Sequence, residues 1–426
     1  QQLSRNPDIY DLLKDSVAPS IWELDDVKKG ILCQLFGGNS FKVEETKAER
    51  HGGGGQKGQG KRGEINVLLC GDPGTSKSQL LGYVHKIAPR GVYTSGKGSS
   101  AVGLTASVVR DQETKQFVLE SGALVLSDNG ICCIDEFDKM SDDTRAILHE
   151  VMEQQTISVA RAGIICTLNA RTAILASANP VESRYNPKRS VVDNIRLPPT
   201  LLSRFDLIYL ILDKAIPEYD RRLAKHLVGL YFKDPPRSDM HMDQNLLRDY
   251  IAYARKNVQP EISEEAADAL RRGYLEMRRA GGQGTKVIAA TPRQLESLIR
   301  ISEALARMRL CPVVSASDVQ EAIRLMRVAT QAAATDPRTG TIDMDMLATG
   351  RSSADREILE EVVQEMKQFL SQHRGKKMTL AELRSKLPEN ILDKLEGGTI
   401  LSDAIVQLED EATITYSERS KMVVVK

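Results

Sequence analysis

The segment that decides the fold reads Gly71-Asp72-Pro73-Gly74-Thr75-Ser76-Lys77-Ser78. It follows a mainly apolar run, residues 65–70, which predicts a buried strand, and it leads into residues 79–81, which predict the start of a helix. A strand, a glycine-bearing loop and a Lys-Ser pair at a helix start are the order that a phosphate-binding loop requires. Backbone N–H groups and the positive helix end attract the phosphates, while Lys77 reaches the terminal phosphates and the Ser78 hydroxyl binds Mg²⁺.

One position departs from that motif, because Ser76 stands where a second glycine is expected. Alone, the segment is equally open to interpretation as an ordinary glycine-rich turn. A second signal follows farther along the chain, where the apolar residues 131–134 predict a strand buried on both faces that ends in Asp135 and Glu136. At the carboxyl edge of a parallel sheet, Asp135 would hold Mg²⁺ through water, and Glu136 would orient and deprotonate the attacking water. The two signals together favour nucleotide hydrolysis.

Polar residues also mark two further predicted strands. Residues 172–176 lead to Asn179, whose amide can hold the attacking water or sense the γ-phosphate. Residues 207–212 predict a fourth strand, which Arg204 precedes. The guanidinium of Arg204 would lie just outside the sheet, available to a neighbouring subunit's nucleotide, unless it pairs within the chain with Asp206. Four sheet-edge elements in this order favour the first alternative.

Two predicted β-hairpins interrupt this core, one between residues 104 and 127 and one between residues 156 and 168. The second has a single basic residue, Arg161, at its tip. That residue is either a solvated loop charge or a contact to nucleic-acid phosphates, which would position the nucleic acid without reading its sequence.

Composition limits the class of protein. The 426 residues carry 58 Lys plus Arg and 58 Asp plus Glu, so a nucleic-acid partner would have to be met by local basic features. The six cysteines show no Cys-x-x-Cys spacing, which favours buried free thiols over disulfides or a zinc site. No run of eighteen apolar residues predicts a membrane span, so no membrane partner is expected. The first residue is Gln, so we expect a fragment whose N-terminal part is missing.

The remaining regions predict a helical flank and two helical units. The only tryptophan, Trp22, is either a core anchor or a wall against a nucleotide base. Thr291-Pro292 predicts a helix start, and Arg293 then lies in the first turn, where the helix dipole disfavours a cation that merely decorates the surface. Arg293 is therefore expected to reach phosphates. In residues 355–426, helical stretches followed by two strands suggest a winged helix, whose acidic third helix, residues 401–411, favours protein docking over DNA reading.

Taken together, these residues resemble the AAA+ motor of the minichromosome maintenance (MCM) replicative helicases. The segment 71–78 is similar to the family's Walker A, which replaces the usual second glycine with a small residue, and residues 135–140 are similar to its Walker B. Asn179 resembles sensor 1, residues 203–206 the arginine-finger motif, and Arg293 sensor 2. The resemblance implies that Lys77, Ser78, Asp135, Glu136 and Asn179 act on this subunit's nucleotide, whereas Arg204 and Arg293 act on the neighbour's. Arg161 matches the basic residue of the presensor hairpin that grips DNA, where lysine is more usual.

The resemblance implies an α/β fold, an AAA+ P-loop core with hairpin insertions, a helical lid and a small C-terminal winged helix. We place the parts at 1–60 (flank and glycine-rich insertion), 61–235 (ATPase core), 236–335 (lid), 336–354 (linker) and 355–426 (winged helix). The implied function is that of an ATP-hydrolysing subunit of a hexameric DNA helicase in the nucleus, with ATP and Mg²⁺ as cofactors. The implied partners are other MCM subunits, single- and double-stranded DNA, and replication loading and activation factors.

Two rival functions share this fold. The chain could be a mainly structural subunit that binds nucleotide to close a ring, although the intact Glu136, Asn179 and Arg204 argue against that role. It could also belong to the protein-remodelling or metal-chelatase AAA+ proteins, which share the core and even the hairpin insertions. DNA binding that survives the loss of Arg161 would favour this second rival.

Overall fold

The computed structural model divides the chain into two compact units, residues 1–350 and residues 351–426. The structure describes residues 3–40, 62–110, 117–161, 164–181, 184–186, 191–213, 216–229, 241–280 and 291–334 of the first unit. In the second unit it describes residues 359, 362–364, 366–367, 377–379, 404–405, 408, 414–417 and 422–425. The predicted glycine-rich insertion, the turn of the first hairpin, the linker and most of the acidic helix lie outside the described residues.

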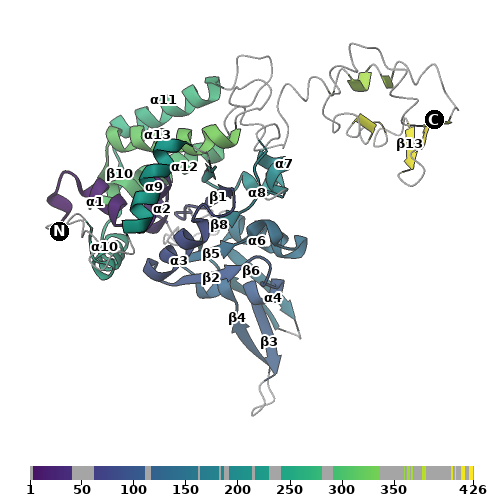
Figure 1. The fold of residues 1–426 in the computed structure, drawn as a ribbon. Helices are drawn as coiled ribbons and strands as arrows, with labels where there is room; N and C mark the ends of the chain where they lie inside the picture. Colours follow the sequence, from purple (N-terminus) through teal and green to yellow (C-terminus); the bar gives the residue numbers. More distant parts are fainter. Residues whose placement is uncertain are drawn as a thin grey trace, which may run out of the picture. The chain divides into compact units, whose positions relative to one another are not determined.

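A five-stranded parallel sheet forms the centre of the first unit (Figure 1), in the order β2-β5-β8-β1-β9. Its strands are β1 (Val67–Gly71), β2 (Gly91–Ser95), β5 (Ile131–Asp135), β8 (Ala173–Ala178) and β9 (Leu207–Ile211). Four of them match the predicted strands, and β2 at the edge completes the sheet. Because all strands run in one direction, their carboxyl ends meet at one edge of the sheet and their amino ends at the other.

Each face of the sheet has its own hydrophobic core. Side chains alternate along β1, so Val67 and Leu69 join one core while Leu68 and Cys70 join the other. All residues of β1 are buried, which explains the uninterrupted apolar run in the sequence. The first core includes helices α1 (Ile9–Ser16), α2 (Asp25–Phe36), α3 (Lys77–Ile87) and α10 (Gln244–Asn257), with the lid helices α11 (Glu264–Ala280), α12 (Pro292–Met308) and α13 (Ala316–Ala334).

The second core lies under short helices and the long helix α6 (Asp142–Gln154). Ser141 caps α6, and its hydroxyl oxygen accepts a hydrogen bond from the Thr144 N–H. Leu148, Val151 and Met152 form the buried face of the helix. The other helices of the unit are α4 (Ala101–Leu104), α5 (Ala123–Leu126), α7 (Val191–Ile195), α8 (Pro199–Leu202) and α9 (Pro217–Gly229), and a short parallel pair joins β10 (Glu261–Ile262) to β11 (Val313–Val314).

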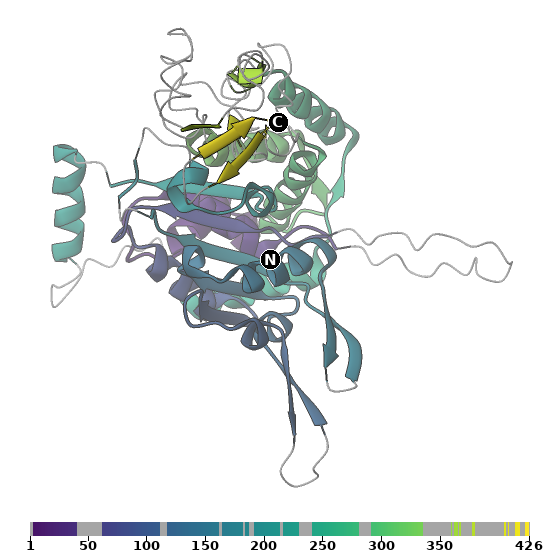
Figure 2. The ribbon, with the colours of Figure 1, turned by 90° about the vertical axis from the view of Figure 1, so that its right-hand side faces the viewer.

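Both predicted hairpins are present and antiparallel. The first pairs β3 (Ala106–Arg110) with β4 (Phe117–Ser121), and the second pairs β6 (Thr156–Arg161) with β7 (Ile164–Asn169). Figure 2 shows both hairpins projecting from the same side of the core. The first exposes Phe117, Val118 and Val109, and Ile165 near the tip of the second is 86% exposed. These apolar tips are not needed for the core of this unit.

The second unit contains a three-stranded antiparallel sheet in the order β12-β14-β13. Strands β13 (Ile414–Ser417) and β14 (Met422–Val425) match the two predicted strands, whereas β12 (Lys377–Thr379) was not predicted. Among the helices within the described ranges, none combines the length and the apolar character that crossing a bilayer requires.

Candidate functional site

The phosphate-loop candidate connects β1 to α3 in a conformation that explains its sequence. Gly71 has φ +145°, and a Cβ atom there would lie 1.8 Å from the backbone oxygen of Ile211, so only glycine fits. Ser76 has φ 61°, in the left-handed region that glycine adopts freely. The serine therefore keeps the backbone course of the motif at a cost of roughly 1–2 kcal/mol.

Lys77 begins α3, and its side chain turns back over the loop. The Nζ atom donates to the backbone oxygens of Gly71 at 2.9 Å and Asp72 at 2.5 Å and to Thr75 Oγ1 at 3.1 Å. Burial lowers the pKa of this ammonium, although neighbouring carboxylates, including those of Asp72 and Asp135, act in the opposite direction. None of the described carboxylates forms an ion pair with it, so a buried cation faces only neutral acceptors. A phosphate would supply the missing negative charge.

Asp135, the last residue of β5, is held from both neighbouring strands. The Tyr93 hydroxyl on β2 donates to its Oδ2 at 2.8 Å, and the Ser177 hydroxyl on β8 donates to its Oδ1. Burial raises the pKa of Asp135, but hydrogen bonds from Ser177, Ser78 and Tyr93 outweigh burial and hold the pKa below its usual value. The Ser78 hydroxyl lies beside this carboxylate, which stays ionised at neutral pH.

Glu136 and Asn179 follow the ends of β5 and β8. Glu136 has φ 51°, so the chain turns sharply as it leaves the strand. The Asn179 N–H donates to Asp138 Oδ1 at 3.1 Å, which fixes the loop after β8 against the loop after β5. Because Cys70 pairs with Ala178 in the sheet, the structure brings Asn179 to the same edge as Lys77. The predicted acidic and amide residues thus meet at the carboxyl edge.

Arg204 lies at the opposite edge. It precedes β9, whose first residue, Leu207, pairs with Val67 at the start of β1. The length of β1 alone separates this end from Gly71 by about 13 Å. The Arg204 Nε donates to Glu153 Oε2 at 3.1 Å, and its Nη1 donates to the Thr200 backbone oxygen at 2.6 Å. The alternative of a pair with Asp206 is not what the structure shows.

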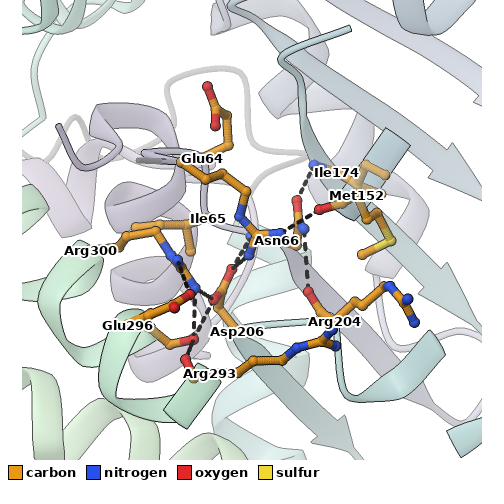
Figure 3. A network of polar contacts seen from close by, with 12 residues as sticks. Glu64, Ile65, Asn66, Met152, Ile174, Arg204, Asp206, Arg293, Glu296 and Arg300 are labelled. Atoms are coloured by element: carbon orange, nitrogen blue, oxygen red, sulfur yellow. Dashed lines mark hydrogen bonds and ion pairs between the residues drawn. The ribbon is translucent and has the colours of Figure 1, made fainter. Parts of the chain in front are cut away.

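Arg293 of α12 reaches the same carboxylate. Its Nη2 lies 2.9 Å from both carboxylate oxygens of Glu153, and its Nη1 donates to Ser203 Oγ at 3.5 Å. Two arginines that are far apart in sequence therefore converge on one side chain of α6. Figure 3 shows Arg204 and Arg293 beside the network around Asp206.

Asp206 joins three parts of the molecule at this amino edge. It accepts hydrogen bonds from the Asn66 N–H at 2.8 Å and from Arg300 Nη2 at 2.5 Å, and Ser297 Oγ donates to it as well. Burial would raise the pKa of Asp206, but Arg300, Arg62 and the hydrogen bonds hold it below its usual value. Since Ser297 also donates to the Arg293 backbone oxygen at 2.9 Å, the carboxylate fixes the start of α12 as well as the Arg204 loop.

Two predicted site residues stand apart from both edges. The Trp22 ring lies 4.8 Å from the ring of His226 on α9, centroid to centroid. None of the ring contacts within the described ranges joins Trp22 to the loop 71–78. Arg161 ends β6 and pairs in register with Ile164, so its backbone lies at the tip of the second hairpin as predicted.

Three residues of this arrangement were not predicted from the sequence, and a fourth, Asp206, was given a different partner. Tyr93 and Ser177 support Asp135, and Glu153 and Asp206 hold the arginines. Tyr93 and Ser177 carry hydroxyl groups on the two strands that flank β5, so recognising them as partners of Asp135 requires the strand order of the sheet. Asp206 was considered only as a partner for Arg204, and Glu153 gave no signal except an acidic residue in the last turn of its helix.

Comparison with known proteins decides the family. The sequence profile of the MCM P-loop domain matches residues 1–231, and that of the MCM AAA-lid domain matches residues 245–330. The chain belongs to the MCM family. Its first unit is accordingly an MCM P-loop ATPase domain followed by an MCM lid, as the resemblance implied.

Individual MCM relatives agree. A DNA replication licensing factor MCM4 of Oryza sativa is 62% identical over 367 residues, covering 85% of this chain and 41% of the relative. One of Arabidopsis thaliana is 56% identical over 430 residues (99% and 49%), and the minichromosome maintenance protein MCM of Saccharolobus solfataricus is 44% identical over 365 residues (85% and 51%). The chain spans about half the length of these curated relatives. In the sequence, Ser76 and residues 334–340 are most similar to subunit four of the eukaryotic MCM heterohexamer, and the MCM4 relatives confirm that likeness.

Proposed function

We propose that this chain is the ATP-hydrolysing motor part of one subunit of a hexameric replicative DNA helicase, with each ATP held between two subunits. The observation that carries the proposal is the separation of the two sets of residues. Lys77, Asp135 and Asn179 lie at the carboxyl edge of the sheet, whereas Arg204 lies beyond its amino edge. One nucleotide within one chain could not reach both sets, but a nucleotide between two chains could.

At the carboxyl edge, the loop 71–78 would hold the phosphates and Lys77 would neutralise the terminal ones. Ser78 and Asp135 fit Mg²⁺, because both present oxygen atoms and they lie within hydrogen-bond contact of each other. When bound, Mg²⁺ would supply positive charge that stabilises the negative charge developing on the phosphates. Glu136 would orient the attacking water and take its proton, and Asn179 would hold that water or contact the γ-phosphate.

At the amino edge, Arg204 and Arg293 would reach the neighbour's nucleotide and stabilise the charge of its transition state. The neighbours would be other MCM subunits. The two hairpins that project from one side of the core would contact single- or double-stranded DNA, with Arg161 on a phosphate. Trp22 is proposed to pack against the nucleotide base.

The C-terminal unit is proposed to be a winged helix, supported by its three-stranded antiparallel sheet and by helical residues, among them 362–364 and 404–405, that precede its last two strands. Its acidic third helix favours docking of loading and activation factors over DNA reading. An assembly that unwinds chromosomal DNA would act in the nucleus.

The test compares ATP turnover by the full-length protein alone and in the ring with its partner subunits. The protein alone should hydrolyse ATP feebly, and adding the correct neighbour should raise the rate by about 10³-fold or more. Glu136→Gln in this chain should then lower the ring's turnover while ATP binding remains. Full turnover by the isolated monomer would refute the shared site, and an unchanged ring rate with Glu136→Gln would favour a structural subunit.

A further inference from the structure

Among the charged groups at the amino edge that the proposed function does not use, the carboxylate of Glu153 contacts both proposed phosphate-binding arginines. It accepts hydrogen bonds from Arg204 at 3.1 Å and from Arg293 at 2.9 Å. These two arginines come from different elements, one from the loop before β9 and one from the first turn of α12. Glu153 is the point at which they meet, and its side chain is 47% exposed.

Helix electrostatics indicates that this meeting is not a chance surface contact. Glu153 lies in the last turn of α6, where the negative end of the helix dipole disfavours a carboxylate. Arg293 lies in the first turn of α12, where the positive end disfavours a guanidinium. Each charge is unfavourable at its own helix end, but each side chain lies where it can pair with the opposite charge on the other helix. The two unfavourable positions become a favourable pair only when the helices are brought together.

Both arginines keep hydrogen-bond donors for an outside acceptor. Arg204 uses Nε and Nη1, and its Nη2 makes no hydrogen bond with any described residue. Arg293 uses Nη1 and Nη2, which leaves its Nε without a partner in the described ranges. The carboxylate therefore holds the two guanidinium groups in place without consuming the donors that a phosphate would need.

We infer that Glu153 is a positioning residue for the arginines that act on the neighbouring subunit's ATP. Two like charges so close together repel each other, and a shared carboxylate offsets that repulsion and fixes both side chains before the phosphate arrives. Preorganised charges of this kind act on the transition state without reorganising during the reaction. The inference rests on the proposed function, because it assumes that Arg204 and Arg293 serve the nucleotide next door.

The experiment uses the full-length ring carrying Glu153→Gln in this chain. The matched control is Glu150→Gln, which makes the same chemical change three residues earlier on α6, where the carboxylate accepts only from the Ser158 N–H at 3.1 Å among the described donors. Steady-state ATP hydrolysis gives kcat and KM, and nucleotide binding to each subunit is measured separately. A small misplacement of catalytic groups costs about 10–100-fold in rate.

We expect Glu153→Gln to lower kcat at the interface with that neighbour by about 10–100-fold, with KM and nucleotide binding nearly unchanged. Glu150→Gln should stay near wild type, and Glu153→Asp should recover part of the loss because it restores the charge. If the Glu153→Gln ring fails to assemble, Glu153→Asp replaces it. The double variant Glu153→Gln with Arg293→Gln then tests the pair, because the effects of substituting two residues in contact are not additive.

The inference is overturned if Glu153→Gln matches Glu150→Gln. It is also overturned if Glu153→Gln raises kcat, because the carboxylate would then compete with phosphate rather than position the arginines. Arg204→Ala separates this failure from failure of the proposed function. If Arg204→Ala leaves ring turnover intact, the shared site itself is wrong, whereas a severe loss there with a normal Glu153→Gln ring refutes only the role of Glu153.

Discussion

The two edges of the parallel sheet solve different electrostatic problems. At the carboxyl edge the functional groups are held mainly by neutral donors and acceptors, as when Tyr93 and Ser177 donate to Asp135. At the amino edge they are held by ion pairs, with Glu153 between two arginines and Asp206 beside Arg300. At one edge a buried lysine has no carboxylate partner among the described residues, and at the other two guanidinium groups share one carboxylate.

Under the proposed function, this difference makes each edge half of a site. The carboxyl edge carries the residues proposed to hold the phosphates and activate the water, Lys77, Asp135 and Glu136. The amino edge offers arginines but no phosphate loop. A mutation at the carboxyl edge should therefore impair this subunit's own nucleotide site, and a mutation at the amino edge should impair the neighbour's.

The largest effect should come from removing the charged groups that define the edges. Arg204→Ala should lower turnover at the neighbour's site by about 10³–10⁵-fold while this chain still binds its own nucleotide. Lys77→Ala should do the reverse, abolishing nucleotide binding here and sparing the neighbour's. Binding of a fluorescent ATP analogue, together with turnover of paired subunits, checks both, and Arg196→Ala, an exposed arginine outside both sets, is the control. Loss of nucleotide binding in the Arg204→Ala chain would contradict the assignment of Arg204 to the neighbour's nucleotide.

Asp206→Asn should destabilise the first unit by about 3–5 kcal/mol, because it leaves Arg300 buried without its counter-charge. Urea unfolding measures the change. Asp268→Asn, which removes an exposed ion pair with Arg271, should cost less than about 1 kcal/mol. Equal effects of the two substitutions would contradict a buried, functional Asp206 pair.

The effect of Asp206→Asn on stability should depend on pH. The folded-state pKa of Asp206 is lowered, so its stabilising contribution is complete above the unfolded pKa of about 3.9 and is lost as pH falls through the folded value. The stability gap between wild type and Asp206→Asn should therefore be constant near neutral pH and should narrow below about pH 4. A gap that widens on acidification would mean that the folded pKa is raised.

Tyr93→Phe should raise the Mg²⁺ concentration needed for half-maximal nucleotide affinity by about 10-fold, since it removes one of the hydrogen bonds that orient Asp135. The measurement is the Mg²⁺ concentration that gives half-maximal nucleotide affinity. Tyr83→Phe removes a similar phenol hydrogen bond, to the Ser16 backbone oxygen at 2.7 Å, and should leave this midpoint unchanged. A Tyr93→Phe protein with wild-type Mg²⁺ dependence would show that Ser177 suffices.

Arg161→Ala should have the smallest effect, lowering the slope of log DNA affinity against log salt by about one. The loss should be the same for all DNA sequences, because a phosphate contact carries no sequence information. Arg271→Ala on the lid is the control. An unchanged slope would mean that the hairpin tip does not touch phosphate, and would favour the protein-remodelling alternative.

How far the sequence predicts the structure also differs between the two edges. The carboxyl edge could be predicted because its residues sit directly at strand ends, where a local motif such as the segment 71–78 determines their position. Ser76 could be accepted as a variant because the resembled family has a small residue at this position, whereas its left-handed backbone became visible only in the structure. At the amino edge the position of Arg204 before β9 could be predicted, but its contact with Glu153 could not, since Glu153 and Arg293 meet only after the lid packs on the core. Strand β12 was missed because three residues give too short a pattern.

The position of Asn66 has a mechanical consequence. Asp206 grips the chain at Asn66, immediately before β1, and the other end of β1 is the glycine that opens the phosphate loop. A short, fully buried strand thus connects the loop proposed to hold this subunit's triphosphate to the edge proposed to contact the neighbour's. In a closed ring, such strands would pass a displacement at one nucleotide to the adjacent one through the sheet itself, with no flexible segment in between.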